Sequence, residues 1–155
     1  MPARKLKELL DGQGVKYVCI THSPAFTAPE IAASAHIPGK QLAKTVVVKL
    51  DGKMAMAVLP ANAGVDFNAL AALAGVRAAT LATEEEFADL FPECEVGAMP
   101  PFGNLYGMPV FAEQALAEDD EIAFNAGSHK ELIKLAYADF ERLAQPTVGP
   151  FARHA

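Results

Sequence analysis

The sequence predicts a mixed domain of the α/β or α+β class, in which short helices and short strands alternate irregularly. Two apolar runs, residues 43–50 and 53–59, flank the dipeptide Asp51-Gly52, a strong signal for an antiparallel β-hairpin. Two further segments have the capping-box pattern, in which a threonine is followed three residues later by glutamate. At 155 residues, the chain is long enough for one domain with a real core.

The N-terminal part contains a helix, a strand and a second helix. Leu6, Leu9 and Leu10 fall on one helical face within residues 3–12, and residues 17–21 read as a strand. The first capping box lies at 27–30, and a short helix should follow it to about residue 35.

The remaining elements follow from caps, prolines and β-branched runs. Asp66 caps a helix, Thr83 opens the second capping box, and Pro146 stops a terminal helix. Residues 131–137 fit neither the helical nor the strand period, so both assignments stay open. We expect helices at 66–74, 83–91 and 138–145, strands at 77–80, 108–112 and 121–125, and a loose tail from Thr147 to Ala155.

Composition and charge restrict the function. Apolar residues make up 52% of the chain, and no apolar run reaches the ~18 residues that a membrane span needs. The net charge of −6 argues against a protein that coats DNA or other nucleic acid. The charge is uneven, with +4 in residues 1–60 and −10 in residues 61–155. A local basic face could therefore meet a few phosphates, although each lysine taken alone is better read as solvated; this face would comprise Arg4, Lys40, Lys44, Lys49 and Lys53.

Cysteine and histidine placement gives no sign of a metal or disulfide framework. Cys19 and Cys94 are far apart, which fits a reducing cytoplasm. The four histidines are scattered without the spacing of paired ligands, so we expect no metal and no cofactor.

The segment Gly97–Gly103 (Gly-Ala-Met-Pro-Pro-Phe-Gly) predicts a rigid loop. Two adjacent prolines fix φ and remove two backbone donors, and the glycines permit turns that other residues resist. Such a loop can form one side of a binding pocket, whereas a tight crossover between elements explains the same residues equally well.

Three further segments contain groups able to bind a ligand or do chemistry. Lys44 begins a predicted strand, where its amine could project into a cleft, although a solvent-facing lysine is the commoner case. Residues 125–129 (Asn-Ala-Gly-Ser-His) supply a hydroxyl and an imidazole beside small residues; a turn with a capping serine and a surface histidine is the alternative. Residues 22–27 link a strand to a helix N-terminus, which favours anions. Adjacent Ser128 and His129 do not make a catalytic triad.

Taken together, these segments resemble the YbaK/prolyl-tRNA-synthetase-associated family of aminoacyl-tRNA editing domains. The resemblance rests on four motifs in the family's order, which span roughly residues 15–140: His22-Ser23-Pro24 with Thr27, Ala43-Lys44-Thr45-Val46, Gly97–Gly103, and Asn125–His129. It implies a single compact domain at 1–146, with a mixed, partly barrel-like sheet surrounded by short helices, and a tail at 147–155.

The resemblance also implies the site. Lys44 would hold the terminal phosphate or the ester end of the substrate, and the Gly97–Gly103 loop would present backbone groups to the aminoacyl moiety and the attacking water. The loop at 127–129 would close the other side and orient the terminal adenosine. Catalytic roles would fall to Lys44 and His129, and binding roles to Phe26, Thr27, Thr45, Leu59, Pro60, Gly97, Met99, Pro100, Pro101, Phe102, Gly103, Asn125, Gly127 and Ser128.

The implied activity is hydrolysis of a mischarged tRNA in trans, without metal and with help from the substrate's 2′-hydroxyl. Such editing is needed because a binding pocket rejects a slightly smaller or isosteric amino acid by only ~1–3 kcal/mol. The family's familiar substrates are prolyl-tRNAs carrying alanine or cysteine. The expected partners are the tRNA acceptor end and an aminoacyl-tRNA synthetase, in the cytoplasm. A non-catalytic module that binds an amino-acid-like ligand or a synthetase is the alternative, followed by hydrolysis of another acyl ester.

Overall fold

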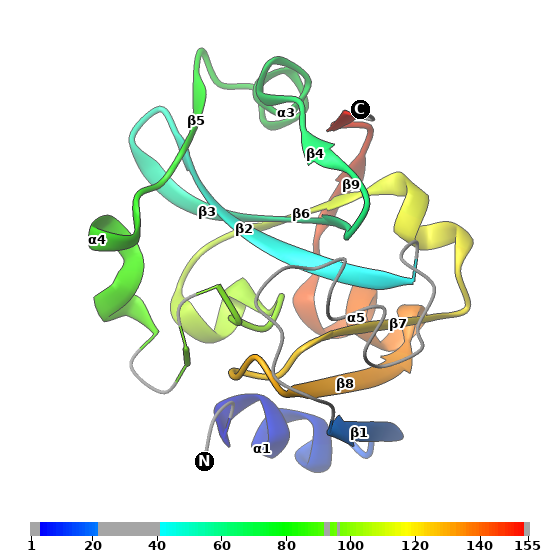
Figure 1. The fold of residues 1–155 in the computed structure, drawn as a ribbon. Helices are drawn as coiled ribbons and strands as arrows, with labels where there is room; N and C mark the ends of the chain where they lie inside the picture. The colour runs from blue at the N-terminus through cyan, green and yellow to red at the C-terminus, as the bar shows by residue number, and fades with distance from the viewer. Residues whose placement is uncertain (1–3, 22–40, 92–93, 96, 154–155) are drawn as a thin grey trace.

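The computed structural model describes residues 4–21, 41–91, 94–95 and 97–153. Within these residues the chain forms a mixed sheet, surrounded by four α-helices and three 3₁₀ segments (Figure 1). The helical segments are α1 (Arg4–Gly12), α3 (Phe67–Ala74), α4 (Glu84–Phe87), η1 (Ala88–Leu90), η2 (Gly103–Tyr106), η3 (Gln114–Glu118) and α5 (Tyr137–Ala144). The strands are β1 (Tyr17–Thr21), β2 (Leu42–Leu50), β3 (Lys53–Pro60), β4 (Gly64–Val65), β5 (Ala79–Leu81), β6 (Val110–Glu113), β7 (Glu121–Asn125), β8 (Glu131–Ala136), β9 (Thr147–Gly149) and β10 (Ala152–Arg153).

The main sheet combines parallel and antiparallel pairs, as the sequence predicted. Its strand order is β1-β8-β7-β2-β3-β6-β9, with β5 added to β2, and β4 pairs separately with β10. The β2–β7, β3–β6 and β6–β9 pairs are parallel, and the other pairs are antiparallel. The sheet curves so that β7–β8 and β3–β6 lie on either side of α5 (Figure 1).

Three of the predicted local signals form as expected, whereas the capping box at 27–30 and the helix after it lie outside the described residues. The β2–β3 hairpin turns at Asp51 and Gly52, whose positive φ values of 50° and 86° suit an Asp-Gly turn. The Asp66 side chain caps α3 by accepting from two backbone amides at 3.1 Å. Thr83 and Glu86 form the predicted capping box of α4, which continues as the 3₁₀ segment η1 rather than as one longer helix.

The segment that the sequence left open, residues 131–137, is strand β8 up to Ala136. Leu132 and Ile133 are both fully buried although neighbouring strand residues point to opposite faces, and β8 pairs on both edges, with β1 and β7. Lys134, on the Leu132 face, is only partly buried, so the alternation of apolar and polar residues is lost at Leu132 and Ile133, which explains the missing period.

The expectation of a loose C-terminal tail is wrong for residues 147–153. Strand β9 pairs with β6 in parallel, β10 pairs with β4, and Phe151 is only 1% exposed. The buried Glu113 carboxylate accepts hydrogen bonds from the backbone amides of Phe151 and Ala152, at 2.5 and 2.7 Å. The segment is therefore held by strand pairing, an apolar anchor and a buried carboxylate.

The core consists of two clusters, one on each face of the central strands. One contains Phe102, Phe124 and Phe140 together with the apolar faces of α1 and α5. The other contains Leu59 of β3, Leu70 of α3 and Phe151. In the described part of the chain, no helix is long and apolar enough to cross a membrane.

Candidate functional site

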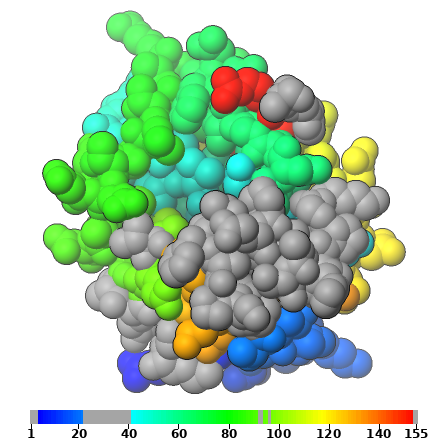
Figure 2. All heavy atoms as spheres, in the orientation of Figure 1, coloured from blue at the N-terminus to red at the C-terminus, as the bar shows by residue number. Residues whose placement is uncertain are grey.

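The candidate site begins at a break in strand pairing along β2. One edge of β2 pairs with β3 over its whole length. The other edge pairs with β7 only at Leu42 and Ala43, and with β5 only from Val48 to Leu50. Among the described residues, Lys44, Thr45 and Val46 thus have no strand partner on this edge. An unpaired stretch of strand edge leaves backbone groups that a ligand could meet, and Figure 2 shows cyan atoms of β2 and β3 between neighbouring green segments.

Lys44 projects from β2 onto the sheet face that packs against α3. Side chains alternate along a strand, so Lys44 shares this face with Val48 and Leu50, which belong to the α3 cluster. Directly across β3 lies Leu59, which is fully buried. Desolvation lowers the pKa of the half-buried Lys44 amine below its ordinary value of 10.5. The side chain is therefore partly desolvated, and its role in a site stays a prediction.

Asn125 follows the last residue of β7 that pairs with β2. The parallel register pairs Leu42 with Ala123 and Ala43 with Phe124 and ends there, so Lys44 and Asn125 each follow directly where the two strands separate. The Asn125 Oδ1 atom is buried and has no hydrogen-bond partner among the described residues. A buried acceptor without a donor is costly in a folded protein, and a bound ligand that donates a proton would satisfy it.

The two glycine-containing loops are joined by backbone hydrogen bonds. The Glu95 amide donates to the Gly127 carbonyl at 2.8 Å, and the Gly127 amide donates to the Ala98 carbonyl at 2.9 Å. Gly97 and Gly127 have φ values of 85° and 89°, which disfavour any residue with a side chain. Because Gly127 follows Asn125 by two residues, roughly 7 Å of chain, the joined loops lie at the same end of the sheet as Lys44.

His129 lies against this junction. A Cβ atom on Gly97 would be 3.5 Å from His129 Cε1, so the backbone of the first loop passes directly beside the imidazole. His129 Nε2 is 4.0 Å from a carboxylate oxygen of Glu95, and the histidine is only 9% exposed. The sequence did not predict the contact between Glu95 and His129, because a glutamate two residues before Gly97 matches no recognisable motif.

Some predicted site residues have structural roles that the sequence did not show. Phe102 is fully buried and stacks edge-on against Phe124 and Phe140, with ring centroids 5.6 Å away in both cases. A Cβ atom on Gly103 would lie 2.6 Å from the Met108 carbonyl oxygen, so this glycine allows close packing. These two residues anchor the loop in the core instead of facing an open site.

The other predicted residues divide between the site and its support. Ser128 Oγ accepts from the Lys130 amide at 3.4 Å, which is the turn alternative for this serine. Thr45 projects to the sheet face opposite Lys44, because strand residues alternate. Met99, Pro100, Pro101 and Pro60 are buried, and Phe26 and Thr27 lie outside the described residues together with His22, Ser23 and Pro24.

The described residues contain no group of three histidine, cysteine, aspartate or glutamate side chains able to hold a metal ion. The chemistry that they do offer is a cationic amine, an imidazole, a buried amide oxygen and backbone groups of two rigid loops. Such a set can bind an ester next to a phosphate and hold a water molecule against it. The expected lack of a metal or cofactor stays a prediction.

Comparison with known proteins identifies the family. Residues 22–143 match the aminoacyl-tRNA editing domain, which covers most of the chain and all four predicted motifs. The chain belongs to the aminoacyl-tRNA editing domain family. The expected resemblance and enzyme class, a hydrolase of the aminoacyl ester, are thereby confirmed at the level of the family.

Individual relatives agree with this assignment. The chain is 32% identical, over 157 aligned residues, to the multifunctional Ser/Thr-tRNA deacylase ProXp-y of Escherichia coli strain K12, covering 98% of this chain and 93% of the relative. The protein of the same name from Escherichia coli O157:H7 matches equally.

Solved structures share the fold. A putative trans-editing enzyme for prolyl-tRNA synthetase superimposes with a TM-score of 0.81 at 22% identity, covering 97% of this chain and 96% of that one. A protein described only as hypothetical superimposes with a TM-score of 0.86 at 20% identity, covering 97% of this chain and all of that one. At these identities the likeness shows the fold alone.

Proposed function

We propose that the protein is a trans-acting deacylase that hydrolyses the ester between a wrongly attached small amino acid and the 3′ end of tRNA. The observation that carries the proposal is the position of Lys44 and Asn125 where the β2–β7 pairing ends, at the end of the sheet where the joined glycine loops lie. The Lys44 amine is partly desolvated there, and Asn125 Oδ1 has no hydrogen-bond partner among the described residues. Family membership and the deacylase relative support the same reaction.

The proposed reaction needs only water as co-substrate. The water oxygen attacks the ester carbonyl carbon, the bond to the terminal ribose oxygen breaks, and free amino acid and tRNA with its hydroxyl restored are released. We assign the Lys44 ammonium to the terminal phosphate or the ester end, where positive charge stabilises the developing oxyanion. The rigid backbone of Gly97–Pro101 would position the water, and the substrate's 2′-hydroxyl would relay the proton.

His129 and Asn125 would orient the substrate. His129 lies beside the Gly97 backbone, so it can close the site against the terminal adenosine. The unpaired Asn125 Oδ1 accepts hydrogen bonds, which suits the α-ammonium group of an aminoacyl ester or a ribose hydroxyl. Leu59, fully buried beside Lys44, would limit the size of the amino acid together with Phe26, Thr27 and Pro60.

The identity of the amino acid is the finer part of the proposal. The relative acts, by its name, on Ser- and Thr-tRNA, whereas the family resemblance suggests alanine or cysteine on prolyl-tRNA. Both sets are small amino acids, and both are compatible with a pocket next to Leu59. We favour serine and threonine, since the match to that relative extends over 98% of the chain. A chain of net charge −6 attracts tRNA weakly by itself, so we propose that a synthetase delivers the tRNA. A cytoplasmic location is part of the same proposal.

The test is amino-acid release from a panel of tRNAs charged with serine, threonine, alanine and cysteine, including tRNA for proline. Wild-type protein should release at least one of these, and Lys44→Ala should lower the rate at least ~100-fold, the scale of losing one oxyanion-stabilising group. Lys49→Ala is the matched control, since Lys49 lies on the same strand, on the opposite face, in an ion pair with Glu86. Tight binding of these tRNAs without release, or full activity of Lys44→Ala, would contradict the proposal.

A further inference from the structure

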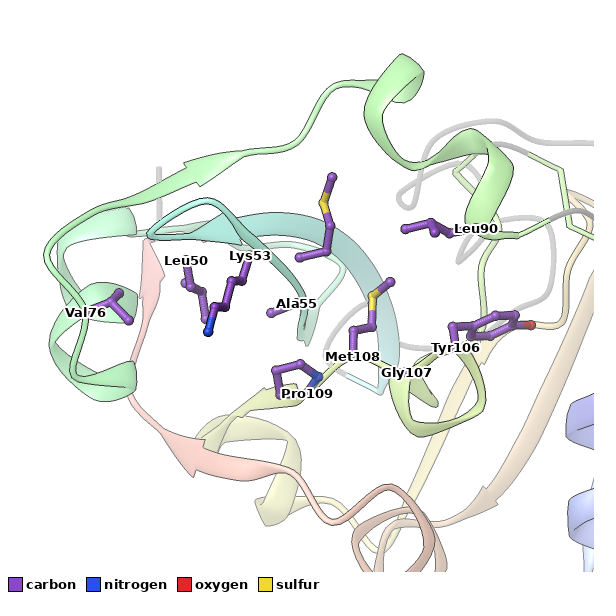
Figure 3. Close-up of a pocket in the computed structure, with 10 residues that line it drawn as sticks. Leu50, Lys53, Ala55, Val76, Leu90, Tyr106, Gly107, Met108 and Pro109 are labelled. Atoms are coloured by element: carbon purple, nitrogen blue, oxygen red, sulfur yellow. The ribbon is translucent and has the colours of Figure 1, made fainter.

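A cavity lies at the turn of the β2–β3 hairpin, away from the candidate site. It has a volume of about 570 Å³ and is bounded by the hairpin, the segment before β5, the end of η1 and the turn before β6 (Figure 3). Leu50, which lines it, follows Lys44 by six strand residues, or roughly 20 Å. None of the predicted site residues lines this cavity.

The cavity has the size and character of a small-molecule site. Ligand pockets usually measure ~300–1,000 Å³ and are mainly apolar with a few polar groups. Here the lining is mostly apolar and includes the thioethers of Met54 and Met108 together with Leu90, which is 40% exposed. Methionine side chains adapt to ligands of different shape, so the cavity can fit a flexible apolar body.

One charged group defines the polar end of this site. Of the lining residues that the structure describes, only Lys53 is charged; its side chain is exposed, and Figure 3 shows its amine turned toward the space bounded by Val76, Ala55 and Pro109. Among the described residues Lys53 has no ion-pair partner. The other polar side chain, Tyr106, already has its hydroxyl 3.7 Å from Cys94 Sγ. The nearby Asp51 carboxylate is also occupied, by the backbone amides of Arg77 and Ala78.

From this charge complementarity we propose that the cavity binds a small apolar monocarboxylate, with its carboxylate on Lys53 and its apolar body against Met54 and Met108. An apolar cavity with one unpaired cation at its rim selects an amphipathic anion over neutral or cationic molecules. The site is separate from the proposed deacylation site, and it does not depend on that function.

The methionines provide a direct test by NMR. The protein is labelled with ¹³C at its methionine methyl groups, of which there are five, and titrated with decanoate below its micelle concentration. The signals of Met54 and Met108, assigned by Met→Leu substitution, should shift with saturation. That of Met99, which is buried in the core and is not among the lining residues, should not.

Two variants and one neutral ligand complete the test. Lys53→Gln should weaken decanoate binding three- to tenfold and leave decanol unaffected, and Lys16→Gln is the matched control on an exposed helix-to-strand turn. Val76→Trp should fill the cavity and abolish both shifts. The proposal is overturned if decanoate leaves Met54 and Met108 unmoved, if decanol binds as well as decanoate, or if Lys53→Gln binds like wild type.

Discussion

Replacing Glu113 with alanine should destabilise the protein strongly, because this one carboxylate holds the C-terminal segment. Glu113 is 5% exposed at the end of β6, and it accepts from the amides of Phe151, Ala152 and Ala115 at 2.5, 2.7 and 3.3 Å. Without it, three buried or half-buried amides lose their acceptor, each at a cost of about 1–3 kcal/mol when buried and less when partly hydrated. The free energy of unfolding should therefore fall by about 3–5 kcal/mol.

Urea unfolding measures this loss directly. Glu118→Ala is the matched control, because Glu118 is an exposed glutamate in the following η3 segment, and it should change stability by less than about 0.5 kcal/mol. Glu113→Gln keeps one acceptor oxygen and should fall between the two. Hydrogen exchange should accelerate most at residues 147–153. If Glu113→Ala unfolds at the same urea concentration as the control, the buried carboxylate does not hold this segment.

Three other predictions concern packing and ionisation. Gly103→Ala should lower the melting temperature, since its Cβ would lie 2.6 Å from a carbonyl oxygen, whereas Gly12→Ala, with no atom within 4 Å, should not. Lys44→Met should raise the free energy of unfolding at neutral pH while deacylation is lost. Desolvation lowers the pKa of Lys44, so the charged amine destabilises the fold below that lowered pKa. This destabilisation decreases as the pH rises toward 10.5, the ordinary pKa of lysine. The hydrogen bond from Lys49 lowers the pKa of Glu86 to about 2 from its usual 4.5, so its stabilising effect is present above pH 4.5 and lost toward pH 2. Acid titration of Glu86→Gln should show less loss over that interval, and a profile identical to wild type would contradict the pairing.

The elements that could be predicted from the sequence are those set by neighbouring residues. The hairpin at Asp51-Gly52, the Asp66 cap and the Thr83 capping box each depend on contacts within a few residues. The C-terminal strands could not be predicted this way, because β9 depends on pairing with β6, more than thirty residues earlier. Pro146 stops α5 as expected but says nothing about where the chain goes next.

The candidate site was predictable as a set of segments and not as a geometry. The motifs indicated Lys44 and the two glycine loops. The structure adds that the loops are hydrogen-bonded to each other and that Lys44 and Asn125 follow directly where the β2–β7 pairing ends. Which face Lys44 occupies depends on register, since a shift of one residue would reverse every side chain. For Phe102 the motif suggested a binding role, whereas the structure shows its ring packed in the core against Phe124 and Phe140.

The most direct test of the account is a footprint of Lys44 with a substrate analogue bound. The lysines are acetylated with trace acetic anhydride and quantified by mass spectrometry, with and without adenosine carrying serine through a non-hydrolysable 3′-amide. The account predicts that the saturating analogue protects Lys44 strongly and leaves Lys49, on the other face of the same strand, unchanged. A bound analogue that leaves the reactivity of Lys44 as it was would contradict the claim that its amine meets the aminoacyl end of tRNA.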